Sequence, residues 1–117
     1  MPKIAIYHNP RCSKSRSTLA ILEENESSPE IVEYLKTPPT ADELATLCKK
    51  LKVEPTAIIR SKEPIFKELG LSLKDDHPAE EWLEILAANP KLIERPIVVK
   101  GAKAVIGRPP ENVLELL

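Results

Sequence analysis

The stretch KIAIYHNPRCSKSRSTLAIL, residues 3–22, passes from an apolar run through a polar loop into a helical pattern. The apolar, β-branched run predicts a strand over residues 3–7, and the apolar spacing that follows the loop predicts a helix over residues 13–25. A second strand is expected over residues 30–34. Two strands joined by one helix with short connections form a βαβ unit, so we expect the two strands to be parallel.

Helices are the expected content of the middle of the chain. Thr40 and Glu43 have the spacing of a capping box, which predicts a helix that runs to Leu51. Residues 55–70 indicate shorter helices divided by prolines, and Pro78 favours the start of a longer helix with an apolar face.

The hydrophobic period changes near the C-terminus. Residues 96–99 and 104–106 alternate around a short polar connection, which predicts an antiparallel hairpin. Pro109 then favours a final helix. The side chains of this helix that we expect to face the core are Val113, Leu114 and Leu117.

The order of the expected elements defines a fold class. A βαβ unit, a run of helices and then a ββα unit give an α/β protein with a four-stranded mixed sheet and an all-helical insertion. This is the layout of the thioredoxin-like fold. We expect a single domain over residues 1–117, with the helical insertion at about residues 40–90.

Composition excludes several classes of partner. With 17 Lys and Arg against 18 Asp and Glu, the net charge of −1 argues against binding to nucleic acid or to anionic membranes in general. No apolar run approaches the ~18 residues of a membrane span, and Met1-Pro2-Lys3 is not typical of a signal peptide. The expected location is therefore the cytoplasm.

Cys12 stands where a strand ends and a helix begins. Unpaired backbone N–H groups and the positive end of the helix dipole favour a thiolate there. Arg11, Lys14 and Arg16 add positive charge, and His8 could donate a hydrogen bond. Each influence lowers the expected pKa of the thiol, and the same N–H groups could bind an oxyanion. The alternative, a small buried hydrophobic residue, is disfavoured because its neighbours are polar.

Spacing around Cys12 argues against three other kinds of thiol site. The C-x5-R loop of low-molecular-weight phosphatases would need arginine where this chain has Thr18. A dithiol oxidoreductase would need C-x-x-C, but Ser15 occupies the second position. The two cysteines and two histidines of the chain lack metal-ligand spacing, so no metal site is expected.

The other cysteine and histidine have simpler interpretations. Cys48 lies between Leu47 and Leu51 on an amphipathic pattern and is expected in the core. His77 follows two aspartates and precedes Pro78, which favours a loop or capping role.

Arginine is scarce, with 5 arginines against 12 lysines, so its placement is informative. Outside the Cys12 loop the arginines are Arg60, Arg95 and Arg108, and the last two each precede a proline at a predicted strand end. Each could be a solvated surface charge. A guanidinium also binds oxyanions with two parallel hydrogen bonds, which lysine cannot do.

Four ordered segments carry a resemblance to a known family. They are YHNPRCSKSR (7–16), YLKTPP (34–39), ERPIVV (94–99) and GRP (107–109). Together they resemble the glutaredoxin-coupled arsenate reductases, a family with a thioredoxin-like fold and a helical insert.

The resemblance implies an activity and its reductants. Cys12 would be the nucleophile that attacks arsenate and forms a thiol adduct. His8 matches a histidine that lowers the pKa of the cysteine, and Ser15 matches a hydroxyl that helps to hold the thiolate. Glutathione would be the co-substrate that attacks the adduct, glutaredoxin would take up the mixed disulfide, and no cofactor would be bound.

The resemblance also implies an oxyanion-binding set. Arg60, Arg95 and Arg108 occupy the positions of an arginine triad that binds and stabilises the oxyanion. Pro96 matches a position that is cis in thioredoxin folds.

Two other functions stay open at this point. The Spx regulators share the fold and bind RNA polymerase, which would make this chain a module that binds a transcription partner; many of them carry C-x-x-C where this chain has Ser15. The chain could also be a monothiol, glutathione-dependent reductase of another substrate.

Overall fold

The computed structural model describes residues 4–25 and 28–117, and they divide into two compact units. The first unit contains the two ends of the chain, up to Thr37 and from Arg95 onward, and the second is Pro38–Glu94. Lys3, where the first strand was expected to begin, and Met1-Pro2 lie outside the described residues. The expectation of a single domain with an insertion at about residues 40–90 stays a prediction.

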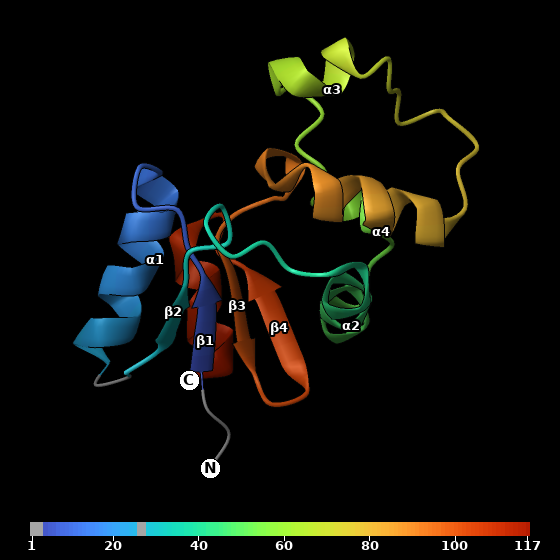
Figure 1. Ribbon diagram of the computed structural model, residues 1–117. Coiled ribbons are helices and arrows are strands. Elements are labelled where there is room, and N and C mark those ends of the chain that lie inside the picture. Colours follow the sequence, from blue (N-terminus) through green and yellow to red (C-terminus); the bar gives the residue numbers. More distant parts are fainter. Residues whose placement is uncertain (1–3, 26–27) are drawn as a thin grey trace. The chain divides into compact units, whose positions relative to one another are not determined.

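The first unit is built on a four-stranded sheet (Figure 1). Its strands are β1 (Ile4–Tyr7), β2 (Glu30–Val32), β3 (Ile97–Lys100) and β4 (Lys103–Ile106). Their order in the sheet is β2-β1-β3-β4, with β1 parallel to β2 and antiparallel to β3, and with β3 and β4 as an antiparallel hairpin. The predicted mixed sheet of a thioredoxin-like fold is therefore confirmed.

Two helices pack against this sheet, α1 (Ser13–Glu24) and the 3-10 helix η3 (Pro110–Leu116). Ile6 of β1 and Val98 of β3 are register partners, so their side chains point to the same face of the sheet. The core on that face comprises Ile6, Leu22, Val98, Val113 and Leu116. Burial of these apolar side chains is the main force that holds α1 and η3 to the sheet.

The inward face of the last helix differs from the prediction. Leu114 and Leu117 are 49% and 44% exposed, whereas Val113 is fully buried and Leu116 is 6% exposed. The reason is that the segment winds as a 3-10 helix, in which residues i and i+3 lie one above the other. The prediction that Leu114 and Leu117 face the core, which assumed α-helical spacing, is therefore wrong.

The second unit is helical, as expected. Its elements are α2 (Ala41–Leu51), η1 (Pro55–Ile58), α3 (Pro64–Glu68), α4 (Ala79–Ala88) and η2 (Pro90–Leu92). Thr40 and Glu43 form the predicted capping box at the start of α2. Two extended residues, Ile59 and Ile93, pair in a single antiparallel bridge.

The core of the second unit lies where α2 and α4 pack together. Its buried side chains include Leu44, Leu47, Trp82 and Leu86. Within residues 4–25 and 28–117, no helix has the length and apolar character needed to cross a membrane.

Candidate active site

Cys12 occupies the position predicted for it, at the N-terminus of α1. It is the N-cap residue of the helix, with an extended backbone. Its carbonyl accepts a hydrogen bond from the N–H of Arg16 at 3.0 Å, and its own N–H donates to the carbonyl of Asn9 at 3.0 Å. The thiol is therefore carried by a short loop that closes on itself just before the helix begins.

Three buried polar residues fix the shape of this loop: His8, Asn9 and Ser15, which are 6%, 9% and 0% exposed. The Ser15 hydroxyl lies 2.6 Å from Nδ1 of His8 and accepts a hydrogen bond from the N–H of Asn9 at 3.0 Å. The Asn9 side-chain oxygen accepts from the N–H of Arg11 at 3.0 Å. Sequence reasoning assigned no role to Asn9, although an asparagine before a proline is a common turn signal.

The environment of His8 favours a neutral ring. Burial lowers the pKa of His8, Glu33 opposes this effect, and Arg16 lowers the pKa further. In the neutral ring Nδ1 can accept a hydrogen bond from the Ser15 hydroxyl, whose oxygen in turn accepts one from the N–H of Asn9. His8 is thus connected to the Cys12 loop through Ser15.

The surroundings of Cys12 lower the pKa of its thiol. Burial raises this pKa, but a hydrogen bond from the N–H of Ser15, the side chain of Arg95 and the N–H of Lys14 together outweigh burial. Ser15 therefore acts on the thiolate through its backbone N–H while its hydroxyl contacts His8. A thiolate at neutral pH is the form in which cysteine acts as a nucleophile.

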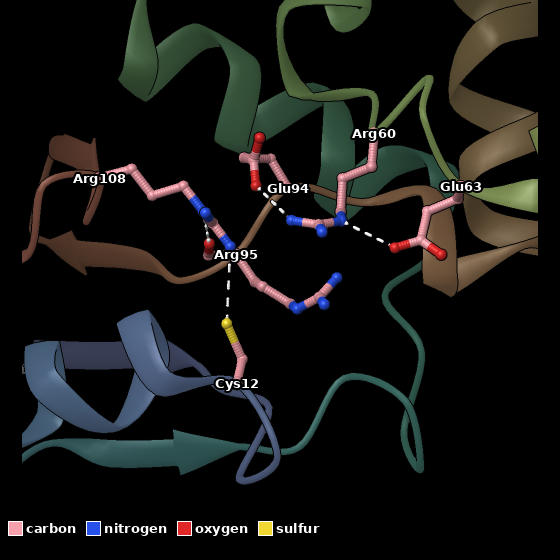
Figure 2. Close-up of polar contacts among 6 residues, drawn as sticks. All are labelled: Cys12, Arg60, Glu63, Glu94, Arg95 and Arg108. Carbon is pink, nitrogen blue, oxygen red and sulfur yellow. Dashed lines mark hydrogen bonds and ion pairs between the residues drawn. The ribbon is translucent and has the colours of Figure 1, made fainter.

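Two of the three predicted arginines come together with Cys12. Nη2 of Arg108 donates to the Cys12 sulfur at 3.5 Å, and Nε of Arg108 donates to the carbonyl of Arg95 at 2.7 Å, as Figure 2 shows. The β3–β4 hairpin explains this placement: Ile97 and Ile106 are register partners, so the arginines that flank the hairpin emerge at one end of it. The Arg95–Pro96 and Arg108–Pro109 peptide bonds are both cis, as expected for Pro96.

The third arginine, Arg60, belongs to the second unit and has acidic partners there. Its Nη1 lies 2.9 Å from Oε1 of Glu94 and its Nε lies 3.2 Å from Oε1 of Glu63 (Figure 2). Burial lowers the pKa of Arg60, but Glu63 and Glu94 more than compensate and hold the pKa above its usual range. The guanidinium is thus permanently charged and fixed in orientation by two carboxylates.

The second thiol, Cys48, has the opposite environment to Cys12. It is 6% exposed on α2, and burial and the nearby charge of Glu54 raise the pKa of its thiol. The prediction that Cys48 is a core residue is confirmed. Across the part of the chain that the structure describes, no group of three or more His, Cys, Asp or Glu residues is arranged to hold a metal ion.

Comparison with known proteins gives one consistent family. The profile of the ArsC family matches residues 7–116. The chain is 51% identical to the protein YfgD of Escherichia coli (strain K12), over 98% of this chain and 97% of YfgD. It is 45% identical to the arsenate reductase of Neisseria meningitidis (serogroup A), over 100% of both chains.

A solved structure shows the same fold. The structure of the arsenate reductase from Vibrio cholerae is 47% identical in sequence and superimposes with a TM-score of 0.93. The match covers 99% of this chain and 98% of the other chain.

Proposed function

The chain belongs to the ArsC family, and we propose that it is an arsenate reductase in which the Cys12 thiolate attacks the arsenic atom. The observation that carries this proposal is the environment of Cys12. Its thiol is at a helix N-terminus, its pKa is lowered, and a guanidinium lies 3.5 Å from its sulfur. Relatives named arsenate reductase match the whole chain, which supports arsenate as the oxyanion.

The groups around the thiol fit a tetrahedral oxyanion. Arg108 and Arg95 supply planar guanidinium groups that can each bind two oxygens. The N–H groups of Lys14 and Ser15, which point at the sulfur, can also contact an oxygen of the adduct. In this proposal these groups lower the barrier by neutralising charge on arsenic-bound oxygens as the S–As bond forms.

The supporting roles of the remaining site residues are part of the same proposal. His8 and Ser15 hold the loop so that the N–H groups converge on the sulfur, which keeps the thiol ionised. Arg60 is proposed as an oxyanion-binding residue on the family resemblance, and its two carboxylate partners keep it charged and oriented.

The electrons must come from thiols. Attack of the thiolate on arsenate forms an S–As bond and releases one arsenate oxygen as water. Reduction from As(V) to As(III) then needs two electrons. A second thiol attacks the Cys12 sulfur, the S–As bond breaks with its electron pair left on arsenic, and arsenite leaves as the two sulfurs, each oxidised by one electron, form a disulfide. Cys48 is an unsuitable second thiol because it is buried and its pKa is raised.

We therefore propose glutathione as the co-substrate and glutaredoxin as the protein that takes up the resulting mixed disulfide. The proposal needs no bound cofactor and no metal, because the thiols carry both electrons. A reductant of this kind is maintained in the cytoplasm, where thiols stay reduced, so the cytoplasm is the proposed location.

The test is release of arsenite from arsenate in the presence of glutathione and glutaredoxin. The wild-type chain is expected to turn over, and Cys12→Ser is expected to lose all measurable activity because serine is not ionised at neutral pH. Cys48→Ala is the matched control: it removes the other thiol and is expected to keep the wild-type rate if the protein stays folded.

Two outcomes would reject the proposal. A folded wild-type chain that releases no arsenite would remove arsenate as substrate, and glutathionylation of Cys12 in the same mixture would then favour a reductase of another substrate. Undiminished arsenite release by Cys12→Ser would remove Cys12 as the nucleophile.

A further inference from the structure

Gly107 lies between β4 and Arg108 in a space that admits no side chain. An ideal Cβ on this residue would lie 2.6 Å from Oγ1 of Thr18 and 2.8 Å from Cγ of Pro96. Real Cβ atoms essentially never approach other atoms so closely, so the surroundings would have to shift. The backbone of Gly107 is outside the left-handed region, so space, and not conformation, is what requires glycine here.

Thr18, on the opposite side of this contact, is a fully buried polar residue of α1. Its hydroxyl lies 2.9 Å from the carbonyl of Lys14 and 3.4 Å from the carbonyl of Gly107. Lys14 also supplies one of the N–H groups that lower the pKa of Cys12. Thr18 therefore contacts both the first turn of α1, which directly follows Cys12, and the segment that carries Arg108.

Two hydrogen bonds tie that segment to the other arginine. The N–H of Gly107 donates to the carbonyl of Pro96 at 2.9 Å, and Nε of Arg108 donates to the carbonyl of Arg95 at 2.7 Å. A displacement of Gly107 away from α1 would therefore move Arg95 and Arg108 together relative to Cys12.

We propose that Thr18 and Gly107 are positioning residues for the reaction, whose close contact sets the distance between the Cys12 sulfur and the guanidinium groups of Arg95 and Arg108. This role rests on the proposed function for its kinetic consequence. Its effect on the thiol itself is independent of any substrate.

The first test replaces Gly107 by alanine. The added methyl group meets the Thr18 side chain and the Pro96 ring, so the backbone at Gly107, and Arg108 with it, must move relative to both. We expect kcat for arsenate reduction to fall on the order of 10-fold to 100-fold, because small displacements of positioned groups have effects of this size. We also expect the pH midpoint for alkylation of Cys12 by iodoacetamide, followed on the Cys12 peptide by mass spectrometry, to move upward toward that of a free thiol.

The second test keeps the shape of Thr18 and removes its hydroxyl. Thr18→Val is expected to raise the alkylation midpoint and to lower kcat, whereas Thr18→Ser, which retains the hydroxyl, is expected to stay within about 2-fold of wild type. Thr46→Val on α2 is the matched control, because the Thr46 hydroxyl makes the same kind of bond to a carbonyl four residues earlier, at 3.1 Å, on an exposed surface.

The alkylation midpoints are measured without arsenate, so they test the positioning role separately from the proposed function. Failure of one can therefore be distinguished from failure of the other. Midpoints and kcat of Gly107→Ala and Thr18→Val equal to those of wild type and Thr46→Val would overturn it. If Gly107→Ala does not fold, Thr18→Val alone decides, and loss of the same size in Thr18→Ser would overturn the role of the hydroxyl. A wild-type chain inactive on arsenate, with the midpoints shifted as expected, would reject arsenate reduction and retain the positioning contact.

Discussion

Cys12 and Cys48 have the same chemistry and opposite surroundings. Cys12 is partly accessible, and its sulfur accepts hydrogen bonds from backbone N–H groups and a guanidinium, which lower the pKa of its thiol. Cys48 is buried among the apolar side chains of α2, and burial raises the pKa of its thiol. The two thiols differ because Cys12 lies at the N-terminus of α1, whereas Cys48 lies on the buried face of α2.

This contrast predicts a pH dependence that differs between the two thiols. The rate of Cys12 alkylation should fall as pH is lowered through its pKa, with a midpoint below the ~8.5 of a free thiol, because only the thiolate reacts. Arsenate reduction should lose activity over the same pH range. Cys48 should stay unmodified in the folded protein, and in urea both thiols should react with a midpoint near ~8.5. A folded-state midpoint for Cys12 at or above the value in urea would contradict the lowered pKa.

Substitutions of Arg95 distinguish the effect of its positive charge from the effect of its planar shape. Arg95→Lys keeps one positive charge but loses the planar fork, so we expect kcat/KM for arsenate to fall by about 100-fold, as removal of a transition-state donor does. The midpoint of Cys12 alkylation should rise less in Arg95→Lys than in Arg95→Leu, which loses the charge as well. A rate unchanged in Arg95→Lys would remove Arg95 from oxyanion binding.

At the scale of single elements, α2 depends on its N-terminal cap. The Thr40 hydroxyl accepts a hydrogen bond from the N–H of Glu43 at 3.1 Å, and the Glu43 carboxylate accepts one from the N–H of Thr40 at 3.2 Å. Thr40→Ala should lower the free energy of unfolding by about 1 kcal/mol, measured by urea denaturation. Thr46→Ala, in the exposed middle of the same helix, serves as the control and should be neutral or slightly stabilising. Equal losses in the two variants would show that the cap contributes nothing specific.

The 3-10 winding of η3 gives two adjacent leucines very different burial. Leu116 is 6% exposed in the core beside Val113, whereas Leu117 is 44% exposed. Leu116→Ala should lower the free energy of unfolding by about 2–5 kcal/mol, and Leu117→Ala should change it by less than about 0.5 kcal/mol. Urea denaturation of both variants measures this difference. The reverse order of losses would mean that the segment winds as an α-helix.

At the scale of the whole molecule, local signals predicted the elements and their order. The capping box at Thr40, the hairpin between β3 and β4, and the strand–loop–helix around Cys12 each depend on residues close together in the sequence, and the structure contains all three. The four-stranded mixed sheet then followed from the order of the elements.

Features that depend on distant or three-dimensional contacts were not predictable in this way. The 3-10 winding of η3 buries Leu116 in the core in place of Leu114 and Leu117. The sequence did not indicate this, because the apolar residues there fit the spacing of either kind of helix. Thr18 and Gly107 are 89 positions apart, so no pattern in the sequence indicated that they touch. Within the candidate site, the thiol and the arginines could be predicted by type, but the hydroxyl contact between His8 and Ser15 required the structure.

The central position of β3 in the sheet has a consequence for the order of events during synthesis of the chain. β1 and the Cys12 loop are made before β3, and β1 gains its antiparallel neighbour only when residues 97–100 have emerged. The partners Cys12 and Arg108 are 96 positions apart, so a growing chain carries the cysteine without this guanidinium until Arg108 has been made. The N–H groups of Lys14 and Ser15 belong to residues close to Cys12 in the sequence, but Arg95 and Arg108 reach the thiol only after β3 and β4 have paired, because pairings between distant segments form slowly.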